Sequence, residues 1–113
     1  MVIGKKNARL GTLMLIFIIS LFVLAGCESK IKGSIPVSDK KTADFPDMAK
    51  ISMSDALNKA QAKVTGKPVQ VEMENEDGYL IYEVEIVRPD KSVMELDVDA
   101  GNGAILKMEK EKD

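Results

Sequence analysis

Hydrophobic and polar positions follow four successive patterns along the chain. Apolar residues run almost without interruption over Leu10–Ala25, whereas Glu28–Ala49 is polar and sustains no repeat of either 2 or 3.6 residues. Apolar residues recur at helical spacing over Ser52–Val64, and after Pro68 they alternate with polar ones. The patterns predict an apolar leader, a polar linker and one small folded domain with a helix and several strands.

The predicted helix carries signals at both ends. Ser52 can cap its N-terminus, while Asp55, three residues later, can return a hydrogen bond to the cap. Gly66 suits a left-handed cap at the other end, and Pro68 cannot continue the helix. We expect an amphipathic helix of about three turns. Its apolar side consists of Ala56, Leu57, Ala60 and Val64.

The remainder of the chain predicts an antiparallel sheet. Alternation of apolar and polar residues indicates three strands with one buried face, over Val69–Glu74, Leu80–Val87 and Met94–Asp99. Turn signals lie at 76–78, 89–91 and 101–103, and residues 104–108 can form a short last strand. The predicted fold is therefore α+β: one helix covers the apolar face of a three- to four-stranded antiparallel meander, whose polar face is in water.

The apolar leader has the features of an export signal. Lys5, Lys6 and Arg9 precede the apolar run, as in the basic segment of a secretory signal. The run ends in Leu24-Ala25-Gly26-Cys27, which resembles the lipobox of bacterial lipoproteins. In that family the cysteine thiol receives a diacylglycerol, and cleavage between Gly26 and Cys27 leaves Cys27 as the acylated N-terminus.

Two alternatives to a lipoprotein signal are an uncleaved membrane anchor and an ordinary secretory signal. The apolar run of about 16 residues is shorter than the roughly 20 of a spanning helix. An ordinary signal would leave a free cysteine on an exported protein, which is uncommon. We therefore expect a signal peptide at 1–26, a lipidated Cys27 with a flexible tether at 27–49, and a folded domain at 50–113. The lipid would hold the domain on the extracytoplasmic face of the cell membrane.

Composition narrows the chemistry further. The chain of 113 residues contains no histidine and only one cysteine, so histidine-based catalytic sites and an intrachain disulfide are excluded. After Gly26 there are 13 basic and 18 acidic side chains, a net charge of −5, with only three aromatic residues. This balance argues against a nucleic-acid partner, which requires a basic surface. We predict no enzymatic activity and no cofactor.

The strand pattern places seven carboxylates on the polar face of the sheet: Glu72, Glu74, Glu83, Glu85, Glu95, Asp97 and Asp99. This face could dock a basic partner or loosely bind cations of the cell envelope. It could also be only a solvated surface that resists aggregation, and we favour that interpretation. A flat exposed sheet is expected to raise no pKa and to supply no pocket, so paired-carboxylate catalysis is not predicted.

The order of several motifs from Lys50 to Met108 resembles the PepSY family. These motifs are Ile51-Ser52, Ala56, Gly66, Gly78 before Tyr82-Glu83-Val84, and Val98-Asp99-Ala100 before Gly103-Ala104-Ile105-Leu106. The sequence departs from the family at Gly101-Asn102-Gly103, where a single glycine usually follows a polar residue. PepSY domains occur in propeptides of thermolysin-like metallopeptidases, in spore-germination proteins and as small exported proteins. The resemblance implies a noncatalytic module that restrains or regulates peptidases outside the cell.

The recurring positions of the family have structural interpretations in this chain. We expect Ser52 to cap the helix and Ala56 to let helix and sheet approach. Tyr82 and Val84 would fill the core, while Asp99 and Gly103 would shape a turn.

Two functions remain open from the sequence. In the first, the domain binds and inhibits or regulates a secreted or cell-surface peptidase. Pairing at a sheet edge would then use the last strand or Val69–Glu74. In the second, it is a structural or sensory module of the envelope that binds wall polymer, cations or another surface protein.

Overall fold

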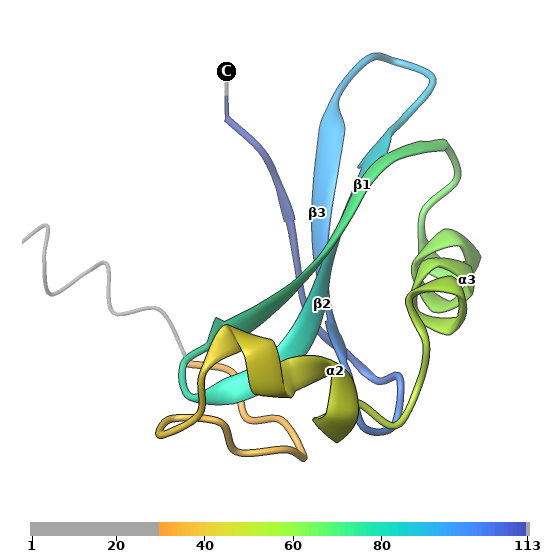
Figure 1. Ribbon diagram of the computed structural model, residues 1–113. Coiled ribbons are helices and arrows are strands. Elements are labelled where there is room, and N and C mark those ends of the chain that lie inside the picture. Colours follow the sequence, from red (N-terminus) through yellow and green to blue (C-terminus); the bar gives the residue numbers. More distant parts are fainter. Residues whose placement is uncertain (1–29, 113) are drawn as a thin grey trace, which may run out of the picture. The chain divides into compact units, whose positions relative to one another are not determined.

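The computed structural model describes residues 30–112. The predicted signal peptide, with Gly26 and Cys27, lies outside the described residues. In chain order the elements are η1 (Thr42–Asp44), α2 (Phe45–Met48), α3 (Met53–Lys63), β1 (Lys67–Glu76), β2 (Tyr79–Val87), β3 (Val93–Asp99) and β4 (Ile105–Lys110) (Figure 1). Within the described range, no helix has the length and apolarity needed to cross a membrane.

The four strands form one antiparallel sheet in the order β1-β2-β3-β4, and α3 lies against one side of it (Figure 1). This arrangement confirms the α+β fold predicted from the alternation of apolar and polar residues. The β1–β2 turn is a two-residue turn in which Asp77 and Gly78 have φ values of 53° and 91°. Two successive positive φ values match the right-handed twist of the flanking strands, which explains the glycine at this position.

Helix α3 begins as predicted. The Ser52 hydroxyl oxygen accepts a hydrogen bond of 3.0 Å from the Asp55 N–H, and the Ser52 N–H donates one of 3.1 Å to the Asp55 carboxylate. These two bonds satisfy main-chain donors that a free helix end would leave unpaired.

The helix ends differently from the prediction. Val64, in an extended conformation, closes α3, and Gly66 does not have the positive φ of a left-handed cap. A Cβ on Gly66 would instead meet the Val87 carbonyl oxygen and lie 2.7 Å from Ile86 Cγ2. The predicted role of Gly66 as a cap is therefore wrong: glycine is needed because the chain leaving α3 passes very close to β2.

The main core lies between α3 and the adjacent face of the sheet. Ala56 and Ala60 are completely buried, so their small side chains let the helix backbone approach the strands. Tyr82 and Val84 fill the centre of the core, as expected, and the Tyr82 hydroxyl donates a hydrogen bond of 2.7 Å to the Ile51 carbonyl oxygen. That bond ties β2 to the chain just before the helix.

One residue predicted to face the core is on the surface. Val69 is 59% exposed, because a register irregularity between Pro68 and Gln70 interrupts the alternation at the start of β1. Val71 and Met73, farther along the strand, are partly buried against the core as predicted.

The predicted flexible tether is wrong from Ile31 onward. The Ile31 N–H donates to the Asp77 carboxylate (2.9 Å), the Val37 N–H donates to the Gly78 carbonyl (2.8 Å), and Phe45 is 4% exposed. The folded unit therefore begins well before residue 50. Periodicity could not indicate this, because the apolar side chains of an irregular segment occupy separate positions against the sheet rather than one helical or strand face.

Candidate functional site

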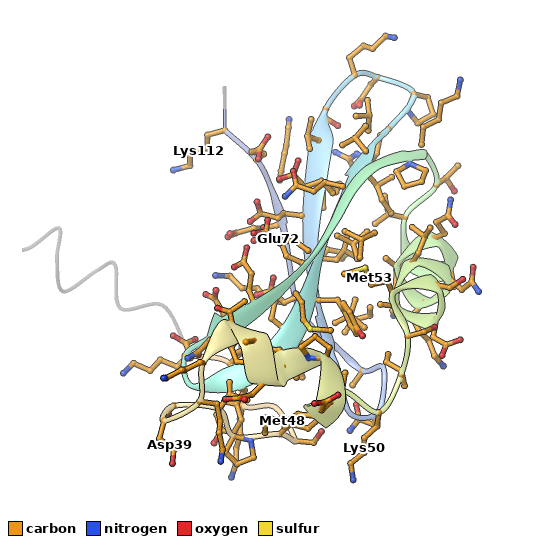
Figure 2. The ribbon with its side chains drawn as sticks, in the orientation of Figure 1. Asp39, Met48, Lys50, Met53, Glu72 and Lys112 are labelled. Carbon is orange, nitrogen blue, oxygen red and sulfur yellow. The ribbon has the colours of Figure 1, made fainter. Side chains whose placement is uncertain are left out.

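A cluster of carboxylates lies on the face of the sheet opposite α3. We call six of its members the acidic face: Glu72, Glu74, Glu83, Glu85, Glu95 and Asp97. Successive side chains of a strand point to opposite faces, and strands in register place same-face residues side by side. The pairs Glu72–Glu83, Glu83–Asp97 and Glu85–Glu95 are direct cross-strand neighbours. Figure 2 shows Glu72 on the side of the sheet away from α3.

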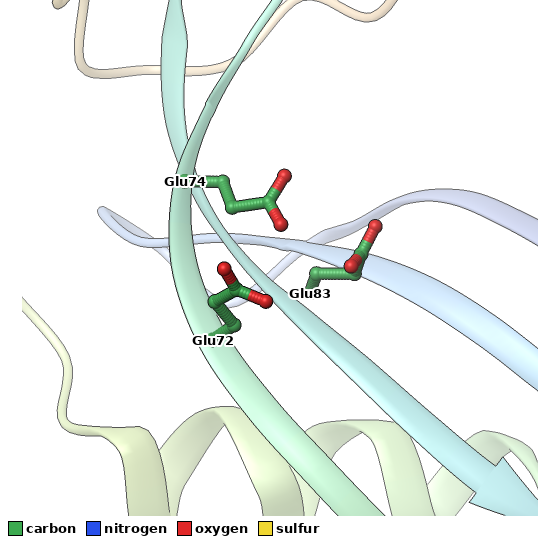
Figure 3. A group of neighbouring side chains, drawn as sticks. All are labelled: Glu72, Glu74 and Glu83. Carbon is green, nitrogen blue, oxygen red and sulfur yellow. The ribbon is translucent and has the colours of Figure 1, made fainter.

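The carboxylates of the acidic face converge in two groups that share Glu83. Glu72 and Glu74 of β1 extend toward Glu83 of β2 (Figure 3), and one carboxylate oxygen from each lies within 4.8 Å of the other two. Glu83, Glu85 and Glu95 form a second group of the same kind. Their positions confirm that these glutamates cluster on one face. Asp97 is only 5% exposed, however, so the prediction that its side chain lies on a solvated surface is wrong.

This crowding changes the protonation of the acidic face. Burial, followed by the negative charge of Glu74, raises the pKa of Glu83 to about 8. Burial, followed by the charge of Glu76, raises the pKa of Asp97 to about 6. Burial is also the largest cause of the raised pKa values of Glu74 and Glu95. The expectation that a flat sheet raises no pKa is wrong, because mutual repulsion and partial burial act together here.

One basic group, Lys107, acts directly on the acidic face. Lys107 on β4 is the cross-strand neighbour of Asp97, and its charge acts to lower the Asp97 pKa. The same ammonium lies 3.7 Å from the Glu109 carboxylate. Burial and the neighbouring carboxylates outweigh Lys107, so the pKa of Asp97 stays raised.

Asp99 does not belong to the acidic face, which corrects the seventh predicted position. It is 2% exposed and accepts hydrogen bonds of 2.7 Å from the Ser34 hydroxyl and from the Gly101 N–H. Its main-chain oxygen accepts a bond of 2.9 Å from the Gly103 N–H. Asp99 therefore shapes the last turn, as its structural interpretation predicted. Asp99 is not in water because the segment preceding the helices, which contains Ser34, covers that end of the sheet.

The acidic face can act chemically in two ways. Each group of three carboxylates could offer one oxygen per residue to a divalent cation, and hard cations such as Ca²⁺ prefer oxygen ligands. The same surface could also attract a basic partner protein, since a concentrated charge of one sign steers oppositely charged surfaces.

Sequence reasoning missed a second feature at the end of the sheet where β1 begins and β2 ends. A pocket of about 590 Å³ lies there, and Lys67, Arg88 and Lys91 contribute to its wall. In the sequence, Lys67 lies in the segment that stops the helix, Lys91 lies in the turn at 89–91, and Arg88 directly precedes that turn. Only the pairing of Lys67 with Val87 brings both turns to one place.

Comparison with known proteins identifies the folded region. Residues 50–109 match the family described as "Peptidase propeptide and YPEB domain", or PepSY. The match spans α3 and most of the four-stranded sheet. Searches of curated proteins and of solved structures found no match. PepSY domains are generally noncatalytic modules resembling propeptides and peptidase inhibitors, which is consistent with a regulatory role. Because this match covers more than half of its residues, the chain belongs to the PepSY family of peptidase propeptide and YPEB domains.

Proposed function

We propose that this protein is a noncatalytic lipoprotein whose PepSY domain binds and inhibits or regulates a secreted or cell-surface peptidase. The observation that carries this proposal is the family match over residues 50–109, which spans the helix and nearly the whole sheet. A domain of a propeptide-like family, on a chain with an export signal, would encounter peptidases outside the cell.

Two surfaces support binding to a protein partner. Strands β1 and β4 are the edges of the sheet. Among residues 30–112, no main-chain hydrogen bond joins the outer edge of β1 to another segment. An unpaired edge can accept an extended segment of a partner through main-chain hydrogen bonds. The acidic face would favour partners with a basic surface beside the contact.

A capture and inhibition experiment tests the peptidase proposal. The full chain, kept in detergent micelles, serves as bait for proteins of the producing cells' membranes and medium. Any captured peptidase is then purified, and its hydrolysis of a peptide substrate is followed at rising bait concentrations. The proposal expects saturable inhibition that weakens when Glu83 and Glu95 are both replaced by Gln. Failure of every captured peptidase to lose activity would contradict it.

The membrane anchor is tested separately by lipid labelling. Cells that express the protein with a palmitate analogue should label the wild type but not Cys27→Ala. Equal labelling of both proteins would overturn the lipoprotein proposal. The capture experiment would keep its meaning, because it does not depend on the anchor.

The alternative function, an envelope module that binds cations or wall polymer, is favoured by one observation. Two clusters of three glutamates share Glu83, and within each cluster the carboxylate oxygens are close enough together to bind one cation. Calcium titration followed by NMR should then shift Glu72, Glu83 and Glu95 together. The absence of any shift at millimolar calcium would remove the cation version of this alternative.

A further inference from the structure

The pocket at the start of β1 combines an apolar wall with a cationic rim. Its apolar part includes Val69, Val87 and Pro89, and its cations are Lys67, Arg88 and Lys91. Three like charges at one end of the domain contrast with the net negative charge of residues 27–113. Among the described residues, none of these three cations forms an ion pair.

Arg88 is held in place by its neighbours. Its Nε–H donates a hydrogen bond of 2.9 Å to the Ser92 hydroxyl oxygen, and that hydroxyl in turn donates to the Asp90 carboxylate at 2.5 Å. The Ser92 N–H donates to the same carboxylate at 2.9 Å. These bonds use one donor of the guanidinium and fix its orientation. Its two terminal nitrogens are suited to binding a carboxylate as a pair of parallel hydrogen bonds.

The direction of β1 indicates how a ligand would arrive. β1 starts at Lys67, beside the pocket, and ends at Glu76. A segment that adds antiparallel to its outer edge must therefore run toward Lys67 and present its C-terminus there. Pro68 has no N–H, and the register is irregular between Pro68 and Gln70, so strand pairing would stop just before the pocket. The last residue of the added segment would then be left to enter the pocket.

We propose that this pocket binds the C-terminal residue of an extended peptide, with its free α-carboxylate on the cationic rim and an aliphatic side chain against Val69, Val87 and Pro89. The combination of a cationic rim with an apolar wall favours this ligand over a bare phosphate. A phosphate would gain from the cations but would leave the apolar wall without a partner. A C-terminal aliphatic residue carries both an anion, its α-carboxylate, and an apolar side chain, so it can contact the cations and the apolar wall together. This site is independent of whether the protein regulates a peptidase.

Fluorescence anisotropy on the full chain in detergent micelles tests the proposal. The probe is an N-terminally labelled hexapeptide of alternating threonine and valine that ends in leucine, either as the free acid or as the C-terminal amide. We expect the free acid to bind at least about tenfold more tightly, because the amide lacks the charge that Arg88 and its neighbours recognise. Equal binding of acid and amide, or no binding at millimolar probe, would overturn the proposal.

Two variants locate the binding site, and a third serves as the matched control. Arg88→Gln should weaken binding of the free acid at least about tenfold, while Lys67→Gln should weaken it several-fold without touching the Ser92 bond. Lys40→Gln removes one positive charge from an exposed position outside the pocket and should leave affinity unchanged. Equal losses in all three variants would show nonspecific attraction and overturn the site. So would displacement of the probe by inorganic polyphosphate but not by excess unlabelled free-acid peptide.

Discussion

The Ser34 hydroxyl donates a hydrogen bond of 2.7 Å to the Asp99 carboxylate, which joins residues 65 positions apart. The same carboxylate oxygen accepts a bond from the Gly101 N–H, and Asp99 is almost completely buried. A buried carboxylate is stable only when hydrogen bonds replace the water it has lost. The segment preceding the helices therefore completes the last turn of the sheet and belongs to the folded unit.

Replacing Ser34 by Ala should lower the free energy of unfolding by about 1.5–3 kcal/mol, the range for a hydrogen bond to a charged group. Urea denaturation of wild type and variant, with equal m-values, measures the difference. Ser54→Ala is the matched control, because Ser54 is exposed on the first turn of α3. If both variants were as stable as the wild type, the Ser34–Asp99 bond would contribute nothing to folding.

The acidic face predicts that stability falls as pH rises from about 5 to 8. Glu83 has a folded-state pKa of about 8 and Asp97 one of about 6, both above their ordinary values of 4.5 and 3.8. The folded protein therefore holds more protons than the unfolded chain between these limits, so unfolding releases protons and is favoured at higher pH. Melting temperatures measured by circular dichroism should be higher at pH 5 than at pH 8.

The variant Glu83→Gln should remove much of this pH dependence and raise the melting temperature at pH 8. Glutamine has nearly the same shape as glutamate but carries no charge, so it removes both the cost of burying a charge and the repulsion from Glu74 and Glu95. Asp39→Asn, at an exposed position before the helices, should retain the wild-type slope. A wild-type slope in Glu83→Gln as well would show that the pH dependence arises elsewhere.

Added salt should stabilise the domain at pH 8. Raising sodium chloride from about 0.01 to about 1 M shortens the screening length from roughly 30 to roughly 3 Å, which weakens repulsion among the partly exposed carboxylates. The melting temperature should rise most in the wild type and less when Glu83 and Glu95 are both replaced by Gln. An identical rise in both proteins would mean that salt acts through general exclusion from the surface rather than on the acidic face.

The sequence predicted those parts of the fold whose signals are local. The capping box of Ser52 and Asp55 and the Asp77-Gly78 turn depend on neighbouring residues, and both are confirmed. The alternation in β2 and β3 is confirmed except where Ile81, Asp97 and Asp99 are buried on the face predicted to be in water. The packed segment 31–49 was missed because its structure depends on distant partners. Phe45 and Val37 are buried against strands that come later in the sequence, and no local repeat of apolar residues can indicate such contacts.

The acidic face shows the same division between local and distant information. Alternation within strands was enough to place six carboxylates together, because the parity of a strand position fixes its face. Asp99 has the same parity, yet its carboxylate is buried and accepts a hydrogen bond from the Ser34 hydroxyl, which lies outside the sheet. The raised pKa values of Glu83 and Asp97 also escaped prediction, since they depend on cross-strand distances and partial burial. The basic pocket was missed for a related reason, because its cations come from two distant segments that only the pairing of β1 with β2 brings together.

Gly66 provides the sharpest test of how the helix is joined to the sheet. Replacing it by Ala should cost about 1–3 kcal/mol, the range for forcing extra atoms into a packed region, because the new Cβ would collide with the Val87 carbonyl and Ile86. A left-handed cap would make a different prediction, since asparagine also tolerates that conformation and would be nearly neutral there. Steric contact predicts that Gly66→Asn is at least as damaging as Gly66→Ala. Thr65→Ala, at the exposed neighbouring position, should change the urea midpoint little. Near-neutral behaviour of Gly66→Asn would restore the cap interpretation and contradict the close approach of this loop to β2.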